Sequence, residues 1–381
     1  MPLMLEDALR ILLASARPGG WEYVGVDEDL VGRVLAEDLM PGADIPRMHT
    51  CAKDGYLVRA DGAWPGEALI SGECGPGEIV KSLEPGEAVI AYSGCLVEDD
   101  LAALVPVEEV VASQGQVAIT RRPRALENII PRGSGARAGE AVLSRGHIVT
   151  PLDVELIEML GRRFVRVYRR PRVAIISVGS EISLEAPSRT TRYVTVKHMV
   201  RALGGEAVNM GTVEDSPSAI ASAITESMAS ADLVVTLGGT GPSAHDVTYL
   251  AAESLGPSEI FRGIDVAEAA RSCGAVVRGK PLLMLPGPRA PALNGATILL
   301  APIIMAFAGS TEGPYRIVHA KLSRRIHMPR RGIVWVRLRE GAADPVHPDY
   351  YGISPSTADG YLIEGPGDLV GDVKVHVPRF L

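Results

Sequence analysis

Apolar and polar residues alternate along this chain with two different periods, which separate helical from strand-forming stretches. In residues 5–16 the apolar positions recur every three to four residues, which predicts an amphipathic helix. Helical sequence returns at Thr150, where a capping Thr precedes Pro151 and Asp153, and it stops at Gly161. Both ends of this second helix therefore carry the usual helix signals.

Two other regions have the short period of β-strands. Between residues 41 and 122, runs such as 88–92 and 116–119 are separated by Pro-Gly-Glu turns, which indicates a small inserted β domain. After residue 313, the runs 333–338, 361–363 and 373–377 predict a second small β domain.

Between these β regions, residues 172–309 alternate apolar strand-like runs with helical sequence, a pattern typical of an α/β domain. We therefore predict an α/β plus β fold, elongated and multidomain, with a central parallel sheet. The predicted domains are 1–40 with 123–171 (discontinuous helical and linker domain), 41–122 (inserted β domain), 172–312 (α/β domain) and 313–381 (C-terminal β domain).

Three Gly-bearing loops follow strand-like runs of the α/β region, at 177–181, 238–241 and 285–289. Loops after parallel strands emerge at one edge of a sheet, and backbone N–H groups of glycine loops can hold an anion. Ordinary strand-to-helix turns would produce the same pattern singly. Three such loops favour a binding cleft.

The composition of the chain limits the classes of partner that we expect for it. The chain has 381 residues, 46% of them hydrophobic, and a net charge of −8, which argues against generic nucleic-acid binding. The apolar stretch 296–307 is too short to span a membrane and is interrupted by Pro302. We expect a cytoplasmic protein with neither nucleic-acid nor membrane partners.

The four cysteines, Cys51, Cys74, Cys95 and Cys273, lack metal-ligand spacing and are expected to be intracellular thiols. A Cys74–Cys95 disulfide is expected mainly in a hyperthermophile. Scarce Asn and Gln favour a hot habitat, although GC-rich coding would give the accompanying excess of Arg over Lys.

The order of these parts resembles the molybdopterin molybdenumtransferases, the family of MoeA and the gephyrin E domain. Residues 46–56 resemble the family segment P-x-x-x-x-S-A-x-D-G-Y, 177–181 resemble S-T-G-D-E, and 279–287 resemble G-K-P-V-F-G-L-P-G. The loop 238–248 is closer still to the molybdopterin adenylyltransferases, which share this α/β domain.

The resemblance implies insertion of molybdate or tungstate into adenylated molybdopterin with Mg²⁺ and release of AMP. It also implies a homodimer, with a molybdopterin adenylyltransferase as the upstream partner. Asp54 and Asp246 are the implied catalytic and metal-binding residues. The residues expected to contact the pterin substrate are Ser177, Gly179, Glu181, Gly238, Gly239, Thr240, Gly241, Ser243, Lys280, Pro286, Gly287 and Pro288.

Several of these residues have simpler interpretations. Asp54 suits an Asp-Gly turn, Asp246 a helix cap, and Glu181 a solvated loop acid, while Lys280 suits an ordinary surface lysine. The chain also departs from the family: Val277 replaces a lysine, and family acids are replaced at Ser180 and Ala244 and at 98–102, 133–135 and 194–196.

Lost charged groups leave three hypotheses open. An active transferase would need Lys280, with Arg278 or Arg271, to cover for the missing lysine. A silent paralogue would bind molybdopterin or a nucleotide as carrier, scaffold or regulator. A hydrolase would cleave adenylated molybdopterin without transferring a metal.

Overall fold

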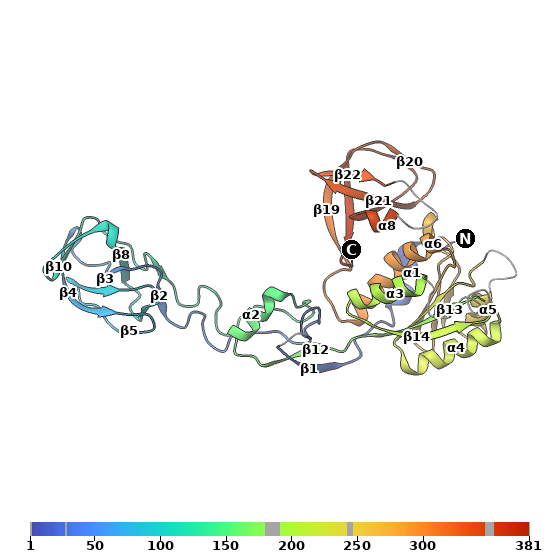
Figure 1. Cartoon of the computed structure of the whole chain (residues 1–381), viewed down its shortest axis with the longest axis horizontal. Helices are drawn as coiled ribbons and strands as arrows, with labels where there is room; N and C mark the ends of the chain where they lie inside the picture. Colours follow the sequence, from blue (N-terminus) through green and yellow to red (C-terminus); the bar gives the residue numbers. More distant parts are fainter. Residues whose placement is uncertain (1, 27–28, 180–190, 242–246, 347–353, 381) are drawn as a thin grey trace. The chain divides into compact units, whose positions relative to one another are not determined.

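The computed structural model describes residues 2–26, 29–179, 191–241, 247–346 and 354–380. The chain forms two compact units, Asp38–Ser144 and the combination of Met1–Glu37 with Arg145–Leu381. Their helices and strands are labelled in Figure 1.

The unit Asp38–Ser144 is built from short strands and one 3-10 turn. They are β2 (His49–Cys51), β3 (Gly55–Arg59), β4 (Gly66–Cys74), β5 (Ile79–Val80), β6 (Glu87–Ala91), β7 (Leu96–Val97), β8 (Ala102–Pro106), η1 (Val107–Glu109), β9 (Val110–Ser113), β10 (Gln116–Ile119) and β11 (Ile129–Ile130). They form two sheets, ordered β8-β3-β6-β4-β10-β9 and β11-β2-β7-β5. In the turn after β3, the Trp64 indole donates to the Arg59 carbonyl at 2.7 Å.

This unit is longer than the predicted insertion 41–122. The segment after residue 122 folds back onto it, since Leu126 N–H donates to the Ala102 carbonyl at 2.7 Å. Strand β11 then pairs with β2. Residues 123–144 therefore belong to the inserted unit and not to the linker domain assigned from sequence.

Helices α1 (Leu5–Leu13) and α2 (Pro151–Met159) precede the α/β sheet in the sequence. Both were predicted, and α2 begins with a capping box between Thr150 and Asp153. Leu5 and Leu12 of α1 are buried in the core of the α/β domain, so α1 belongs to that domain. Strand β1 (Trp21–Gly25) pairs antiparallel with β12 (Phe164–Tyr168) beside α2.

The α/β domain contains β13 (Arg172–Val178), β14 (Glu206–Val213), β15 (Leu233–Leu237), β16 (Glu259–Phe261), β17 (Cys273–Val277) and β18 (Lys280–Leu285). The order across the sheet is β14-β13-β15-β18-β17-β16. The sheet is mixed and not purely parallel, because β17 runs antiparallel to both neighbours. Only Arg278 and Gly279 connect β17 to β18, and a two-residue hairpin cannot join parallel strands.

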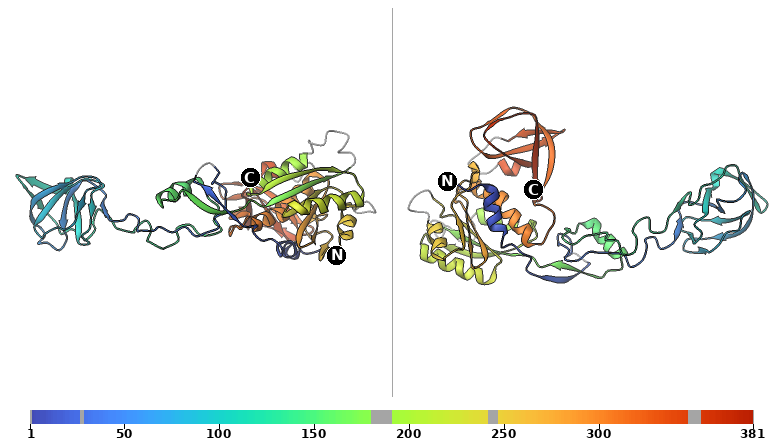
Figure 2. Two further views of the ribbon diagram at one scale, coloured as in Figure 1. Left: turned by 90° about the horizontal axis from the view of Figure 1, so that it is seen from below. Right: turned by 180° about the vertical axis from the view of Figure 1, so that it is seen from behind.

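Helices cover both faces of this sheet (Figure 2). They are α3 (Thr191–Ala202), α4 (Pro217–Ser230), α5 (Val247–Ser254), α6 (Arg289–Gly295), the π-helical turn η4 (Ala296–Leu300) and α7 (Ala301–Phe307), with a short η3 (Ala267–Ala269) before β17. One core joins the sheet to α1, α3, α6 and α7, and a second core joins its other face to α4 and α5.

Pro302 does not interrupt its helix, contrary to the sequence analysis. Residues Arg289–Phe307 form one helical run of 19 residues that is long and apolar enough to cross a membrane by length and composition, and 78% of it is buried inside the protein. The π turn η4 shifts the hydrogen bonds, so that Ala301 N–H donates to the Ala296 carbonyl just before Pro302. The burial is that of a core helix.

The C-terminal part is a closed barrel of five strands. They are β19 (Tyr315–Leu322), β21 (Gly332–Arg339), β22 (Ala342–Pro345), β23 (Gly360–Glu364) and β25 (Asp372–Pro378), accompanied by β20 (Ile326–Met328), α8 (Ser354–Thr357) and β24 (Gly367–Leu369). The buried Trp335 of β21 donates its indole N–H to Asn294 of α6 at 2.9 Å, which fastens the barrel to the α/β domain.

Candidate functional site at the carboxyl edge of the sheet

The order in which the chain adds strands to the sheet changes direction between β13 and β15. From β13 the chain passes to β14 on one side, and then crosses to β15 on the other side. Open α/β sheets bind ligands at such a point, because the loops that follow the two strands diverge there. Strands β13 and β15, which the two predicted loops follow, therefore end at the switch point of this sheet.

Two glycines after β15 are required by close packing. A Cβ on Gly238 (φ +112°) would lie 2.4 Å from the Val178 carbonyl oxygen, and one on Gly239 (φ +70°) would lie 2.1 Å from Thr248 Oγ1. Thr248 in turn donates its hydroxyl to the Gly238 carbonyl at 3.1 Å. The loop is thus pressed between β13 and α5, where only glycine fits.

The predicted amide donors divide into two groups. Gly179 N–H donates to Val213 at 3.1 Å and Gly238 N–H donates to Leu285 at 3.0 Å, so these two amides are engaged within the sheet. The N–H groups of these two glycines are therefore already occupied in the free protein. The N–H groups of Gly239, Thr240 and Gly241 form no hydrogen bond with other described residues.

Buried polar groups without partners concentrate at the same edge. Within the described residues, six buried side-chain polar atoms lack a hydrogen bond, and five lie here: Thr212 Oγ1, Thr236 Oγ1, Thr240 Oγ1, Ser272 Oγ and Arg289 Nε. Thr212 and Thr236 are the penultimate residues of β14 and β15. Ser272 precedes β17, whose first residue pairs with Met284 near the end of β18. Arg289 follows β18 by four residues.

An unpaired buried donor costs about 1–3 kcal/mol, so native proteins keep few of them. Their collection along the sheet edge that contains the switch point is the property expected of a polar ligand site. None of Thr212, Thr236, Ser272 and Arg289 was selected from the sequence. Each stands at or just beyond a strand end, and that position was the available signal.

Other predicted residues lie near this edge with less to distinguish them. Ser177 is buried in β13, where its backbone pairs with Thr212 and Leu237. Pro286 is buried, while Gly287 and Pro288 are half-buried and lead into α6. Glu181, Ser243 and Asp246 lie outside the described residues.

Lys280 is not at this edge and lies apart from the three glycine loops. It begins β18, whereas the ligand-facing loops follow the end of that strand. Its amine donates to the carbonyls of Met228 and Ala231 at 2.7 and 2.8 Å, at the end of α4. Arg278 lies in the adjoining β17–β18 turn, so it is at the same edge as Lys280, opposite the carboxyl ends of β13 and β15.

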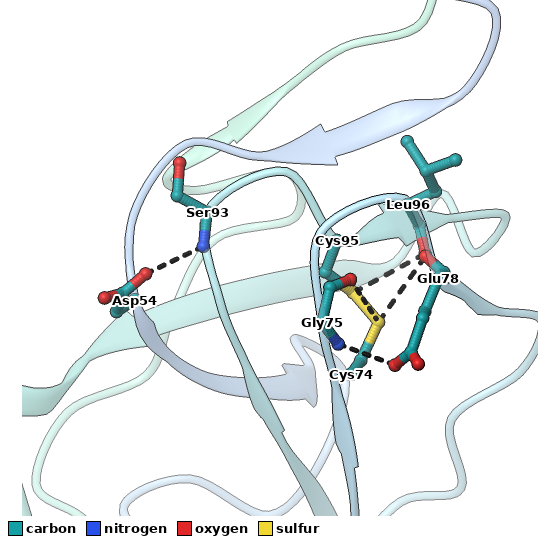
Figure 3. The surroundings of a disulfide bond; sticks show 7 residues. All are labelled: Asp54, Cys74, Gly75, Glu78, Ser93, Cys95 and Leu96. Atoms are coloured by element: carbon teal, nitrogen blue, oxygen red, sulfur yellow. Dashed lines mark hydrogen bonds between the residues drawn. A yellow bond between two sulfur atoms is a disulfide. The ribbon is translucent and has the colours of Figure 1, made fainter.

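Asp54 lies in the other compact unit, between β2 and β3, and is exposed. Its carboxylate accepts the Ser93 N–H at 2.8 Å (Figure 3). Two residues beyond Ser93, Cys95 is disulfide-bonded to Cys74, so the bridge that the sequence left open is present. Tyr92 has its pKa raised, first by a hydrogen bond to Glu73 and further by the nearby charges of Glu73 and Asp54.

The remaining cysteines fit structural roles. Cys51 and Cys273 are buried and form no disulfide, and burial raises the pKa of Cys51 to about 11. No group of three His, Cys, Asp or Glu side chains that could hold a metal occurs in the part of the chain that the structure describes.

Two protein-family models match long segments of this chain. Residues 3–161 match the model of the "MoeA N-terminal region (domain I and II)". Residues 174–306, from β13 to α7, match that of a "probable molybdopterin binding domain". The chain belongs to the MoeA family.

Individual MoeA relatives agree with the two matches. The molybdopterin molybdenumtransferase of Haemophilus influenzae is 26% identical over 64% of this chain and 63% of its own length. That of Staphylococcus epidermidis is 25% identical over 84% of this chain and 80% of its own. The molybdopterin biosynthesis MoeA protein of Pyrococcus horikosii has a TM-score of 0.78, 26% identity and full coverage of both chains. The resemblance drawn from the motifs is thereby confirmed.

Proposed function

We propose that this protein inserts molybdate or tungstate into adenylated molybdopterin and releases AMP, as a step of molybdenum cofactor biosynthesis. The observation that carries the proposal is the set of unpaired buried polar groups at the carboxyl edge of the molybdopterin-binding domain. A phosphorylated pterin offers many acceptors, so its binding would give these donors the partners that they lack in the free protein.

Asp54 and Asp246 are proposed as the catalytic carboxylates and as the ligands of Mg²⁺. Magnesium commonly takes one or two protein carboxylates and completes its shell with water and substrate phosphates. A bound Mg²⁺ would neutralise charge at the pyrophosphate bond that is broken. The Ser93 N–H holds the Asp54 carboxylate in place for such a role.

The wider setting is proposed on the same basis. We expect a cytoplasmic homodimer that receives its substrate from a molybdopterin adenylyltransferase. The residues proposed from sequence as substrate contacts at described positions, apart from Lys280, lie in or beside the loops after β13, β15 and β18. A hot habitat would account for an intracellular Cys74–Cys95 disulfide.

The test measures AMP release from adenylated molybdopterin in the presence of Mg²⁺ and molybdate. Activity should be lost in Asp54→Ala and Asp246→Ala but kept in Asp61→Ala, whose carboxylate pairs with Arg59 on the surface of the inserted unit. Substrate binding without AMP release would instead identify a carrier or regulator. AMP release without metal insertion would identify a hydrolase.

A further inference from the structure

Among the described cations of this domain, Arg289 is distinguished by a buried side-chain nitrogen that has no hydrogen-bond partner. Its Nε is buried without a hydrogen bond, and its side chain forms no ion pair with any described residue. Arginine presents a rigid fork of donors that suits carboxylates and oxyanions, and it stays charged at every relevant pH. Burying the Arg289 Nε–H group without an acceptor therefore lowers the stability of the folded protein.

Arg271, beside Ser272, is exposed, and two further cations of the domain are engaged elsewhere. Lys280 is fixed to the end of α4 at the opposite edge of the sheet. Arg262 lies over the Tyr249 ring at 5.3 Å from its centroid. Arg289 instead directly follows the Pro286-Gly-Pro288 loop, at the carboxyl end of β18.

The neighbouring loop supplies donors of a second kind. Gly238 N–H donates to Leu285, so the loops after β15 and β18 start from adjoining positions. Thr240 in the first loop is only 6% exposed, and its hydroxyl has no partner. A cationic fork and a buried hydroxyl on adjoining loops form a donor set for a tetrahedral oxyanion.

We propose that Arg289 binds a tetrahedral oxyanion at the carboxyl edge, with the Thr240 hydroxyl as a further donor. This inference rests on the proposed function. It makes Arg289 a residue that binds one particular group of the substrates at the carboxyl edge. Two substrate groups share the chemistry: a phosphate monoester and the metal oxyanion. The net charge of −8 makes such local attraction necessary.

The experiment measures binding of inorganic phosphate and of molybdate to the full chain by isothermal calorimetry. Arg289→Gln should weaken one of the two by roughly tenfold to a hundredfold, the range for a hydrogen bond to a charged group. Weaker phosphate binding alone assigns the phosphate to Arg289, and weaker molybdate binding alone assigns the metal oxyanion. Arg289→Lys, which keeps the charge but loses the fork, should fall between Arg289→Gln and the unchanged protein.

Arg201→Gln is the matched control, since it removes an exposed arginine near the end of α3, just before the start of β14, and should leave both affinities unchanged. Equal binding by Arg289→Gln and the unchanged protein would overturn the inference, as would an equal loss in Arg201→Gln. The AMP-release assay separates the two proposals. If the unchanged protein releases AMP and Arg289→Gln retains its KM for molybdate and for the adenylated pterin, only the role of Arg289 fails. If the unchanged protein releases no AMP, the proposed function itself fails.

Discussion

Replacing Thr236 by Val should stabilise the ligand-free protein and weaken its binding of the pterin substrate. Thr236 is fully buried in β15, and its hydroxyl has no partner among the described residues. Valine has nearly the same shape and carries no polar group. Because an unsatisfied buried hydroxyl costs about 1–3 kcal/mol, its removal should raise the free energy of unfolding of this domain by a similar amount.

Thr297→Val provides a control with the opposite expected sign. Thr297 is 3% exposed in the same domain, but its hydroxyl donates to the Leu293 carbonyl at 2.9 Å. The same chemical change should there lower the free energy of unfolding by about 0.5–1.5 kcal/mol. The pair separates the effect of an unpaired hydroxyl from that of any Thr-to-Val exchange.

Urea titration with hydrogen exchange of β15 peptides measures both variants. With an m-value of about 2 kcal/mol/M, a gain of about 2 kcal/mol moves the unfolding midpoint upward by about 1 M. Calorimetry with the adenylated pterin measures the loss of affinity. If Thr236→Val is destabilised as much as Thr297→Val, the hydroxyl is satisfied within the protein and the reasoning is refuted.

Three further predictions concern the loops and the inserted unit. Cys95→Ser should lower the stability of that unit by about 3 kcal/mol, the chain-entropy value for a bridge across 21 residues, and faster hydrogen exchange confined to it would verify this. Gly239→Ala should displace the loop after β15 and reduce pterin affinity in calorimetry. Gly256→Ala, with φ +63° but no atom within 4 Å of the added carbon, should lose stability alone, and similar affinities of the two would refute the clash argument. If one catalytic site joins two subunits, mixing Asp54→Ala and Asp246→Ala proteins should restore about a quarter of the AMP release, whereas an inactive mixture would place both aspartates in one chain.

Local sequence patterns were sufficient to predict those helices and strands whose structure depends on interactions within one short segment. The cap at Thr150 and the apolar face of residues 5–16 each correspond to an observed helix, because capping and amphipathicity act within a few residues. The same holds for β15, a short apolar run between a helix and a glycine loop. Family motifs added the order of the domains, and the comparisons agree with that order.

The sequence was insufficient where contacts between distant segments determine the direction of a strand or the position of a side chain. The direction of β17 depends on which strand it pairs with, and a short apolar run is the same in either direction. Lys280 was assigned to the glycine loops by its motif, although it begins β18 and the loop of that motif follows the other end of the strand. Arg289 was overlooked because a missing partner is a property of packing and leaves no trace in the sequence.

The placement of tryptophan gives this protein a built-in set of optical reporters. The chain has three tryptophans, and they fall in three different parts: Trp21 in the β1–β12 ribbon, Trp64 in the inserted unit and Trp335 in the barrel. Their surroundings differ as well, since Trp21 is 48% exposed, Trp64 is tied to a turn carbonyl and Trp335 is 6% exposed and bonded to Asn294. Emission from variants that each retain one tryptophan would therefore report on one part at a time, without any attached dye.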